Sequence, residues 1–371
     1  KKNIVFIIGT RPEAIKLAPL ILKFKSINLF NSKVFLTGQH KEMVLKVLSL
    51  FQINYDYDLN LMLRNQTLCH ITCKTLEGLE KLFKNEKPDL VFVQGDTTSA
   101  YAASLAAFYQ KISIAHVEAG LRTNEIYDPF PEELNRRLIS QIASLHFAPT
   151  ESSKQNLKLS RVIGEIHKTG NTVIDTLHLA INKKPNINFK ELGLVENQYI
   201  LCTIHRRENW GVKLESITLA LKKLLDVNKK IKILFPMHKN NLLRETFFKV
   251  LGNNPRAVLI EPLNYVDLIY SIKKSLILIT DSGGLQEEAP SLNKPVIVVR
   301  DTTERQEAID CGAAVLVGTN TNKIVNTVNK LITNKEIYNS MSRVNNPYGD
   351  GKASERIIKV CENYLKREIE R

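Results

Sequence analysis

The chain has 371 residues, of which 43% are hydrophobic, and a formal net charge of +14. This length and composition are typical of a globular protein with room for two domains. No apolar run could span a bilayer and no signal-peptide pattern opens the sequence, so we expect a cytoplasmic protein without a membrane partner. The five scattered cysteines suit a reducing compartment, and their spacing predicts neither disulfides nor a metal site.

The positive charge is spread over the whole chain. There is no basic block with interleaved aromatic residues and no nucleic-acid-binding motif, so we predict a solvated, lysine-rich surface and no nucleic-acid partner. The same charge would favour an anionic substrate drawn into a cleft.

Short β-branched runs alternate with longer amphipathic segments throughout the chain. Apolar runs without strict alternation indicate strands buried on both faces, as in parallel sheets. We therefore predict an α/β fold, with strands at residues 4–8, 34–36, 90–93, 112–117, 145–148, 199–203, 231–235, 258–260, 276–280, 296–299 and 314–317. Helical patterns lie between these runs, for example at residues 42–50 and 214–225.

The number of predicted strands indicates two doubly wound sheets rather than one. Segments rich in glycine, asparagine and proline at residues 170–172 and 345–351 are typical of crossings between domains. We predict a first domain of residues 1–169, completed by a C-terminal helix of residues 353–371, and a second domain of residues 170–352.

Polar side chains repeatedly follow the predicted strands at their carboxyl ends, where open α/β sheets bind ligands. Each could instead be a helix cap or a loop ion pair. Their recurrence on two sheets nevertheless favours one shared site in a cleft. The residues are Thr10, Arg11, Asp96, Glu118, His205 to Glu208, His238, Asp281, Ser282, Arg300 and Asp301.

One turn combines several features of a nucleotide site. The strand at residues 276–280 ends in Asp281, Ser282, Gly283 and Gly284, which open a helix containing Glu288. Bare N–H groups at a helix N-terminus bind phosphate, and carboxylates one turn further on can reach sugar hydroxyls. The segment therefore predicts a site for a phosphorylated sugar or nucleotide, with an ordinary Ser282-capped turn as the alternative. No dinucleotide fingerprint or P-loop is present, which argues against a nicotinamide cofactor and against ATP hydrolysis.

Taken together, these segments resemble the non-hydrolysing UDP-N-acetylglucosamine 2-epimerases of bacteria. The resemblance implies two Rossmann-like domains facing a cleft, as in the GT-B class of glycosyltransferases, with the C-terminal helix crossing back to the first domain. The matching segments keep the family's order over nearly the whole chain and lie at residues 9–16, 95–98, 116–123, 131–136, 205–209, 280–290, 300–305 and 346–351.

The resemblance implies a reversible C2 epimerisation of UDP-GlcNAc to UDP-ManNAc that needs no cofactor and feeds cell-surface polysaccharide synthesis. UDP would be eliminated to leave a 2-acetamidoglucal and would then be added back. Asp96, Glu118 and Glu132 correspond to the family's catalytic carboxylates, and His205 is functionally important in the family. Ser282 to Gly284 would hold the diphosphate and Glu288 the ribose. The predicted ligands of the UDP-sugar are Arg11, Lys16, His205, His238, Ser282, Gly283, Gly284, Glu288 and Arg305.

The family often binds a second UDP-GlcNAc as an allosteric activator, and it commonly forms homodimers. Gln39, His40, Gln66 and Arg206 match the positions of this effector site. The chain has Glu42 and Asn65 where activated relatives often carry Gln and Arg.

Three other interpretations remain open at this stage. A GT-B-type UDP-sugar glycosyltransferase would use the same UDP site but would pass the sugar to an acceptor. A 2-epimerase of a related UDP-sugar would differ only in its substrate. A nucleotide-sugar-binding regulator would lack the chemical step altogether.

Overall fold

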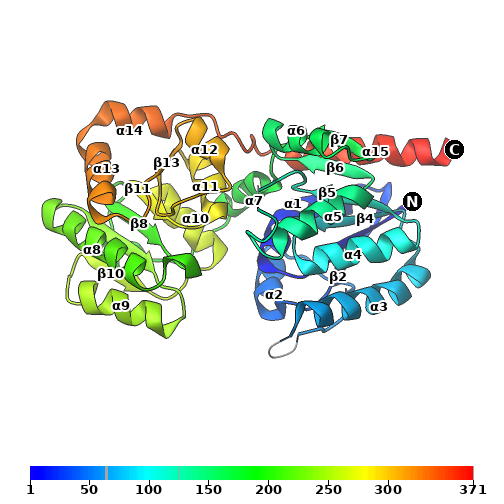
Figure 1. Cartoon of the computed structure of the whole chain (residues 1–371), viewed down its shortest axis with the longest axis horizontal. Coiled ribbons are helices and arrows are strands. Elements are labelled where there is room, and N and C mark those ends of the chain that lie inside the picture. The colour runs from blue at the N-terminus through cyan, green and yellow to red at the C-terminus, as the bar shows by residue number, and fades with distance from the viewer. Residues whose placement is uncertain (63–65, 124, 371) are drawn as a thin grey trace. The chain divides into compact units, whose positions relative to one another are not determined.

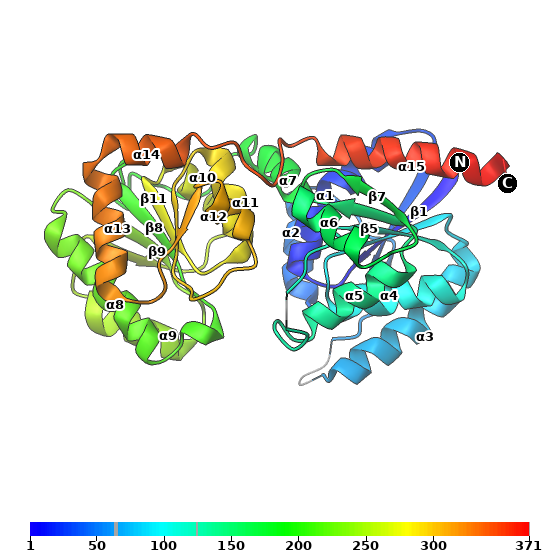
Figure 2. The same ribbon diagram turned by 45° about the horizontal axis from the view of Figure 1, so that its top comes forward.

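The computed structural model describes residues 1–62, 66–123 and 125–370, so Asn65 and residue 371 at the end of the predicted C-terminal helix lie outside the described residues. The chain divides into two compact units. The first comprises Lys1–Thr176 and Tyr348–Arg371, and the second comprises Leu177–Pro347. Each unit has its own parallel sheet with helices on both faces (Figures 1 and 2).

The first unit contains a parallel sheet of order β3-β2-β1-β4-β5-β6-β7 among the described residues. Its central strands consist mainly of buried apolar residues because helices cover both faces. Phe6 on β1 stacks on Phe92 of β4 with ring centroids 4.7 Å apart. The strands are β1 (Lys2–Ile8), β2 (Phe30–Leu36), β3 (Tyr57–Asp58), β4 (Leu90–Gln94), β5 (Ser113–Val117), β6 (Leu145–Ala148) and β7 (Glu165–Lys168).

The second unit contains a parallel sheet of order β10-β9-β8-β11-β12-β13 among the described residues. Ile200, Ile233, Ile277 and Ile297 from four neighbouring strands belong to one buried apolar cluster. The strands are β8 (Tyr199–Thr203), β9 (Lys232–Pro236), β10 (Ala257–Ile260), β11 (Ile277–Thr280), β12 (Val296–Val298) and β13 (Ala314–Leu316).

The helices connect successive strands and cover the sheets. In the first unit they are α1 (Arg11–Ser26), α2 (Lys41–Leu50), α3 (Leu68–Glu86), α4 (Thr98–Tyr109), α5 (Glu132–Ile142), α6 (Glu151–Leu159) and α15 (Ala353–Glu370). Helix α7 (Thr172–Ile181) spans the division between the units. In the second unit they are α8 (Val212–Val227), α9 (Asn241–Leu251), α10 (Tyr265–Lys274), α11 (Gly283–Glu288), α12 (Gln306–Asp310), α13 (Thr321–Thr333) and α14 (Lys335–Ser342), with 3-10 turns η1 (Arg207–Asn209) and η2 (Ala289–Leu292). None of the described helices is both long and apolar enough to cross a membrane.

The predicted fold class is confirmed, with two Rossmann-like parallel sheets. Every predicted strand overlaps an observed one, but β3 and β7 were not predicted. Strand β3 has only two residues, Tyr57 and Asp58, and β7 reads Glu-Ile-His-Lys, so neither shows an apolar run. The arrangement of the two units around a cleft stays a prediction.

The C-terminal helix α15 returns to the first unit, as predicted, and packs against α1 (red in Figures 1 and 2). Its first turn is anchored by Asp175, which accepts hydrogen bonds from the backbone N–H groups of Ala353 and Ser354 at 3.2 and 2.8 Å. The Asn171 N–H also donates to the Tyr348 carbonyl at 2.6 Å. These bonds tie the start of α7 and residues 348–352 to the first unit, so the divisions fall after Thr176 and Pro347 rather than at residues 169 and 352.

Each sheet has one point where the strand order reverses. Strands β1 and β4 flank it in the first sheet, and β8 and β11 flank it in the second. Helices after these strands leave toward opposite faces, which opens a crevice beyond the carboxyl ends of the strands where ligands of such sheets bind. The residues that follow these four strands are therefore the prime candidates for a site.

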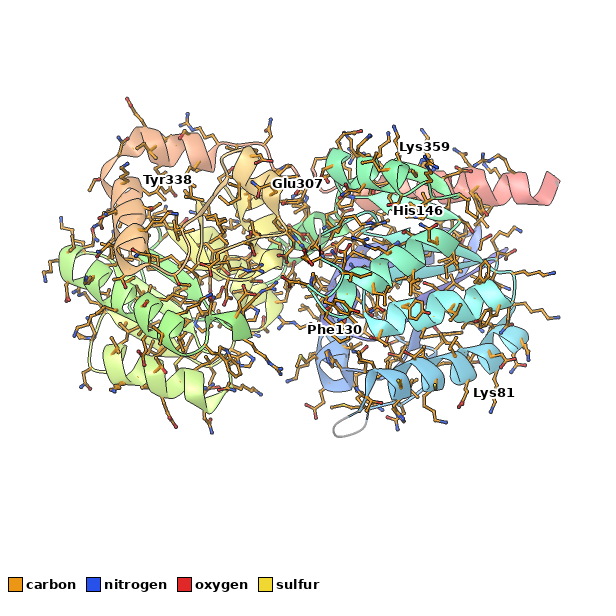
Figure 3. All side chains as sticks on the ribbon, in the orientation of Figure 1. Lys81, Phe130, His146, Glu307, Tyr338 and Lys359 are labelled. Carbon is orange, nitrogen blue, oxygen red and sulfur yellow. The ribbon has the colours of Figure 1, made fainter. Side chains whose placement is uncertain are left out.

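Two buried histidines lie opposite each other on the neighbouring strands β5 and β6 of the first sheet. His116 on β5 donates a 2.7 Å hydrogen bond from Nε2 to the Gly95 carbonyl, and burial lowers its pKa to about 4. His146 on β6 lies in the interior of the unit (Figure 3), and among the described residues neither of its ring nitrogens has a hydrogen-bond partner of good geometry. Burial, together with the neighbouring His116, lowers the pKa of His146 to about 3.

We expect His146 to make the first unit sensitive to acid. The pKa of His146 in the folded protein lies below the ordinary value of 6.5. As the pH falls, His146 therefore becomes protonated in the unfolded chain while it stays neutral in the folded one. The free energy of unfolding should therefore fall by roughly 3 kcal/mol between pH 6.5 and 4 through this group. His146→Leu should remove that loss without destabilising the protein at pH 7, as measured by urea unfolding at both pH values.

His167→Leu is the control, because His167 lies half-buried on the neighbouring strand β7. It should leave in place the loss of stability that His146 causes between pH 6.5 and 4. An unchanged acid sensitivity in His146→Leu would contradict the assignment.

Candidate active site

The loop after β1 is built around one buried carboxylate. Glu13, on the first turn of α1, accepts hydrogen bonds from the N–H groups of Gly9 and Thr10 at 2.7 and 2.6 Å, which closes a capping box with Thr10. It also accepts a hydrogen bond from the Thr97 hydroxyl in the loop after β4. Glu13 thus joins the two loops that flank the reversal point and fixes the backbone next to Arg11.

Lys16 and Glu118 form a buried ion pair at the same reversal point. The Lys16 ammonium contacts Glu118 Oε2, and the two side chains are only 9% and 6% exposed. The Asn171 amide donates a second hydrogen bond to the same oxygen at 2.8 Å. Glu118 follows β5 with a φ of +63°, a left-handed conformation that is uncommon for residues other than glycine and often occurs at functional sites. Lys16 was predicted as a UDP ligand, and here it faces a predicted catalytic carboxylate.

Asp96 is the second predicted catalytic carboxylate. It follows β4 and makes an ion pair with Arg136 of α5, whose side chain is buried. Arg136 also contacts Glu133 at 3.2 Å, and Glu133 accepts a 3.0 Å hydrogen bond from the Thr123 N–H. The third carboxylate, Glu132, is the first residue of α5 and is half-buried.

These contacts show that Glu132 and Glu133, neighbours at the start of α5, lie in different environments. Glu133 is fully buried and also binds Arg137 at 2.7 Å, so its role is structural. Glu132 points from the same turn but remains partly accessible, which is what a side chain that meets a substrate requires.

The predicted effector residues of the first unit lie together. Gln39 accepts a hydrogen bond from the Ser99 hydroxyl at 2.7 Å, and its carbonyl lies 3.5 Å from the Gln66 amide nitrogen. The His40 N–H donates to the Gly9 carbonyl at 2.9 Å, which ties this group to the loop after β1. Burial lowers the pKa of His40, so its ring is neutral at physiological pH.

In the second unit, Asp281 organises the loop after β8. Its fully buried carboxylate accepts hydrogen bonds from the His205 and Arg206 N–H groups at 3.0 and 2.9 Å and from the Asn209 amide at 3.1 Å. It also contacts His205 Nδ1 at 3.1 Å. Burial opposes the charge of Asp281, but these donors and the His205 ring outweigh it and lower its pKa. Asp281 therefore orients His205, whose ring stacks at 6.5 Å on that of His238.

The Glu304 carboxylate forms ion pairs with three arginines beside the turn at Gly283. Its carboxylate contacts Arg206 at 3.3 Å, Arg300 at 2.7 Å and Arg305 at 3.4 Å. Burial opposes its charge, yet the arginines lower the pKa of Glu304 to about 2. A Cβ atom added to Gly283 would lie 3.0 Å from this carboxylate, so the turn and the arginines share one small space.

The turn itself fits an anion site better than a capped helix start. Ser282 occupies the N-cap position of α11, but its hydroxyl makes no capping bond. Gly283 and Gly284 open the helix, and an added Cβ on Gly284 would meet nothing closer than 4.0 Å. One turn on, Glu288 is buried and accepts a 2.5 Å hydrogen bond from the Tyr265 hydroxyl. Arg305 is held by Glu287 at 2.7 Å.

Several residues that organise these loops escaped the sequence analysis as site residues. They are Glu13, Arg136, Asn171 and Glu304. Asp281 was noted there as a polar residue that follows an apolar strand and precedes Ser-Gly-Gly, but its role in holding the loop after β8 was not predicted. Among the described residues, no three histidine, cysteine or acidic side chains are grouped so as to hold a metal ion.

Comparison with known proteins decides the family. The family described as UDP-N-acetylglucosamine 2-epimerase matches residues 23–362. A UDP-N-acetylglucosamine 2-epimerase of Bacillus subtilis is 46% identical over 96% of this chain and 94% of its own. The chain belongs to the UDP-N-acetylglucosamine 2-epimerase family. The predicted resemblance is thereby confirmed, and the family's members are isomerases.

Two solved structures of this family extend over almost the whole chain. UDP-GlcNAc 2-epimerase from Neisseria meningitidis bound to UDP-GlcNAc is 45% identical, with a TM-score of 0.90 over 97% of this chain and all of that one. The S. aureus MnaA–UDP co-structure is 43% identical, with a TM-score of 0.90 over 99% of this chain and 97% of that one. The GT-B-like class predicted for this chain is the fold of these epimerases.

We expect Lys16→Met to destabilise the protein by about 3–5 kcal/mol, because it leaves the buried Glu118 carboxylate without its counter-ion. Lys16→Met/Glu118→Gln should recover a large part of that loss, because the amide carries no charge. Urea unfolding of both variants and of Glu118→Gln gives the coupling energy. Additive effects of the two substitutions would contradict the pairing.

Proposed function

We propose that the protein interconverts UDP-GlcNAc and UDP-ManNAc by moving a hydrogen at C2 of the sugar. The strongest support for this proposal is the position of four polar side chains just after strands of the two sheets. In the first sheet, Asp96 follows β4 at the reversal point and Glu118 follows the adjacent strand β5, and in the second sheet His205 and Ser282 follow the two strands at the reversal point. This proposal also includes the arrangement of the two units around one cleft.

In this proposal the second unit binds UDP. The N–H groups of Ser282, Gly283 and Gly284 would hold the diphosphate, because a turn without bulky side chains lets phosphate oxygens approach the backbone. Arg305 adds positive charge next to the turn, and Glu288, fixed by Tyr265, would bind the ribose hydroxyls. His205 and His238 would complete the UDP-sugar site, with Asp281 holding the His205 ring in place.

The first unit would act on the sugar. A carboxylate removes the C2 proton while the C1–O bond breaks, so UDP leaves with the electron pair and a C1–C2 double bond remains in the 2-acetamidoglucal. UDP then adds back to C1 and a proton is delivered to the opposite face of C2. Because the two faces of the ring each need a proton donor or acceptor, the carboxylates Asp96, Glu118 and Glu132 are the proposed acid–base groups.

The cations of the first unit would stabilise the negative charge that develops on the leaving diphosphate. Arg11 begins α1, where the helix N-terminus already favours an anion. Lys16 contacts Glu118, and we propose that its ammonium is shared between this carboxylate and the diphosphate during the reaction. In this proposal the departing diphosphate draws the Lys16 ammonium away from Glu118, and the Glu118 carboxylate becomes a stronger base.

We expect the amide variants Asp96→Asn, Glu118→Gln and Glu132→Gln each to lower the turnover of UDP-GlcNAc by about 10²–10⁴-fold while leaving UDP binding largely intact. The measurement is incubation with UDP-GlcNAc alone, with products resolved by NMR. Glu125→Gln, an exposed carboxylate in the same loop region, is the matched control and should retain full activity.

The same incubation separates the competing functions. A glycosyltransferase would make no UDP-ManNAc without an acceptor, an epimerase of another UDP-sugar would leave UDP-GlcNAc unchanged, and a regulator would bind it without turnover. Any of these results for the natural sequence would overturn the proposal, as would near-normal turnover in all three amide variants.

We further propose that UDP-GlcNAc activates the enzyme at a second site formed by Gln39, His40, Gln66 and Arg206. The grouping of the first three residues beside the β1 loop supports this. In the reverse reaction from UDP-ManNAc, a trace of UDP-GlcNAc should then shorten the initial lag, and Gln66→Ala should abolish this response. A rate that is insensitive to added UDP-GlcNAc would contradict it.

We also propose a cytoplasmic homodimer that supplies UDP-ManNAc for cell-surface polysaccharide synthesis. Two adjacent helices of the first unit expose apolar side chains, with Phe108 and Tyr109 at the end of α4 and Leu134 and Leu138 on α5. Such a patch is typical of a subunit interface. Sedimentation equilibrium should give twice the chain mass, and Leu138→Glu should shift it toward the monomer. A monomer at all concentrations would contradict the dimer.

A further inference from the structure

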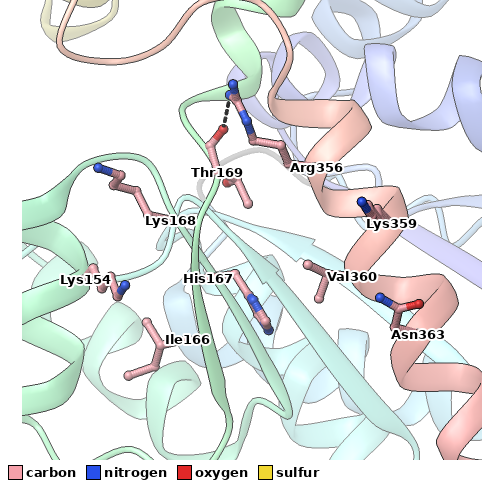
Figure 4. A pocket seen from close by; sticks show the side chains of 9 residues that line it. All are labelled: Lys154, Ile166, His167, Lys168, Thr169, Arg356, Lys359, Val360 and Asn363. Carbon is pink, nitrogen blue, oxygen red and sulfur yellow. Dashed lines mark hydrogen bonds between the residues drawn. The ribbon is translucent and has the colours of Figure 1, made fainter.

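A cationic pocket of about 540 Å³ lies on the first unit between α6, β7 and α15 (Figure 4). None of the predicted catalytic, UDP-binding or effector residues lines it. We call it the α6–α15 pocket, and its lining residues are Lys154, Ile166, His167, Lys168, Thr169, Arg356, Lys359, Val360 and Asn363.

The positive charges of this pocket are only partly balanced. Lys168 contacts Glu151 at 3.2 Å, and Arg356 contacts Asp350 at 2.7 Å. Lys154 and Lys359 have no ion pair with any described residue, although they come from two different helices and line the same hollow. Lys154 is half-buried and Lys359 is exposed, so the hollow carries two cations whose charge no described carboxylate balances by an ion pair.

We propose that the α6–α15 pocket binds a small phosphorylated ligand, namely a nucleotide or sugar that carries at least two phosphate charges. Ammonium and guanidinium groups form short, charge-assisted hydrogen bonds with phosphate oxygens. Ile166 and Val360 supply apolar surface beside the cations of this open hollow. A base or sugar ring attached to the phosphates would cover this surface.

The pocket is connected to the segment where the chain leaves the first unit. Arg356 donates a 3.0 Å hydrogen bond to the Thr169 carbonyl (Figure 4). It also binds Asp350. Asn171, which holds Glu118, lies two residues further along the chain. A phosphate that engages Arg356 would therefore compete with Asp350 and act on the strand end that leads to Asn171.

The test is titration of the whole protein with inorganic pyrophosphate and, separately, with ADP. The readout is the methyl NMR signals of Ile166 and Val360, which report on this pocket alone. We expect saturable shifts with both probes. Lys154→Ala/Lys359→Ala should weaken the affinity at least about tenfold, because two charge-assisted contacts are lost. Tighter binding of ADP than of pyrophosphate would assign the pocket to nucleotides, and equal binding would assign it to the phosphate groups alone.

Lys158→Ala/Lys366→Ala is the matched control, because it removes the same charge from the exposed surface of the same two helices. It should bind both probes like the natural sequence. Absence of saturable shifts, or equal weakening in both double variants, would overturn the proposal. Because the signals are local, this outcome does not depend on whether UDP binds at the candidate active site.

Discussion

The buried contact between Lys16 and Glu118 is the interaction on which the first unit's candidate site depends. A carboxylate with only 6% of its side chain exposed is costly unless a cation and a hydrogen-bond donor compensate it, and Lys16 and Asn171 do both. The sheet topology brings these groups together, because α1 starts at the reversal point and Glu118 follows the strand two places away. Glu118, which we propose as an acid–base group, is therefore held as a charged carboxylate in a largely dry position.

In the second unit the roles of the charges are reversed, because a carboxylate holds arginines in place. Its arginines contact the half-buried Glu304, and the backbone of the loop after β8 is held by the buried Asp281. Because Gly283 leaves room beside this cluster, an incoming diphosphate would meet arginines that are already positioned. Such preorganisation lowers the cost of ordering side chains at the moment of binding. A basic surface spread over the whole protein would not by itself provide this arrangement.

Much of the fold could be predicted from the sequence, because buried parallel strands appear as short apolar runs and the loops after them carry the polar residues. Strands β3 and β7 lack such runs and were missed. The hydrogen-bond and ion-pair partners of the candidate residues could not be predicted from the sequence. Glu132 and Glu133 are indistinguishable as neighbours at a helix start, and only the tertiary contacts of Glu133 with Thr123, Arg136 and Arg137 separate them. Asn171 and Glu304 gain their importance from residues 53 and 98 positions away, which no local pattern reveals.

The most direct test of the account is an NMR time course with UDP-GlcNAc and the natural sequence in heavy water. If carboxylates of the first unit exchange the C2 proton while the second unit retains UDP, deuterium should appear at C2 of both UDP-GlcNAc and UDP-ManNAc as they reach equilibrium. Conversion to UDP-ManNAc without deuterium at C2 would contradict the proposed proton transfer, and unchanged UDP-GlcNAc would contradict the function itself.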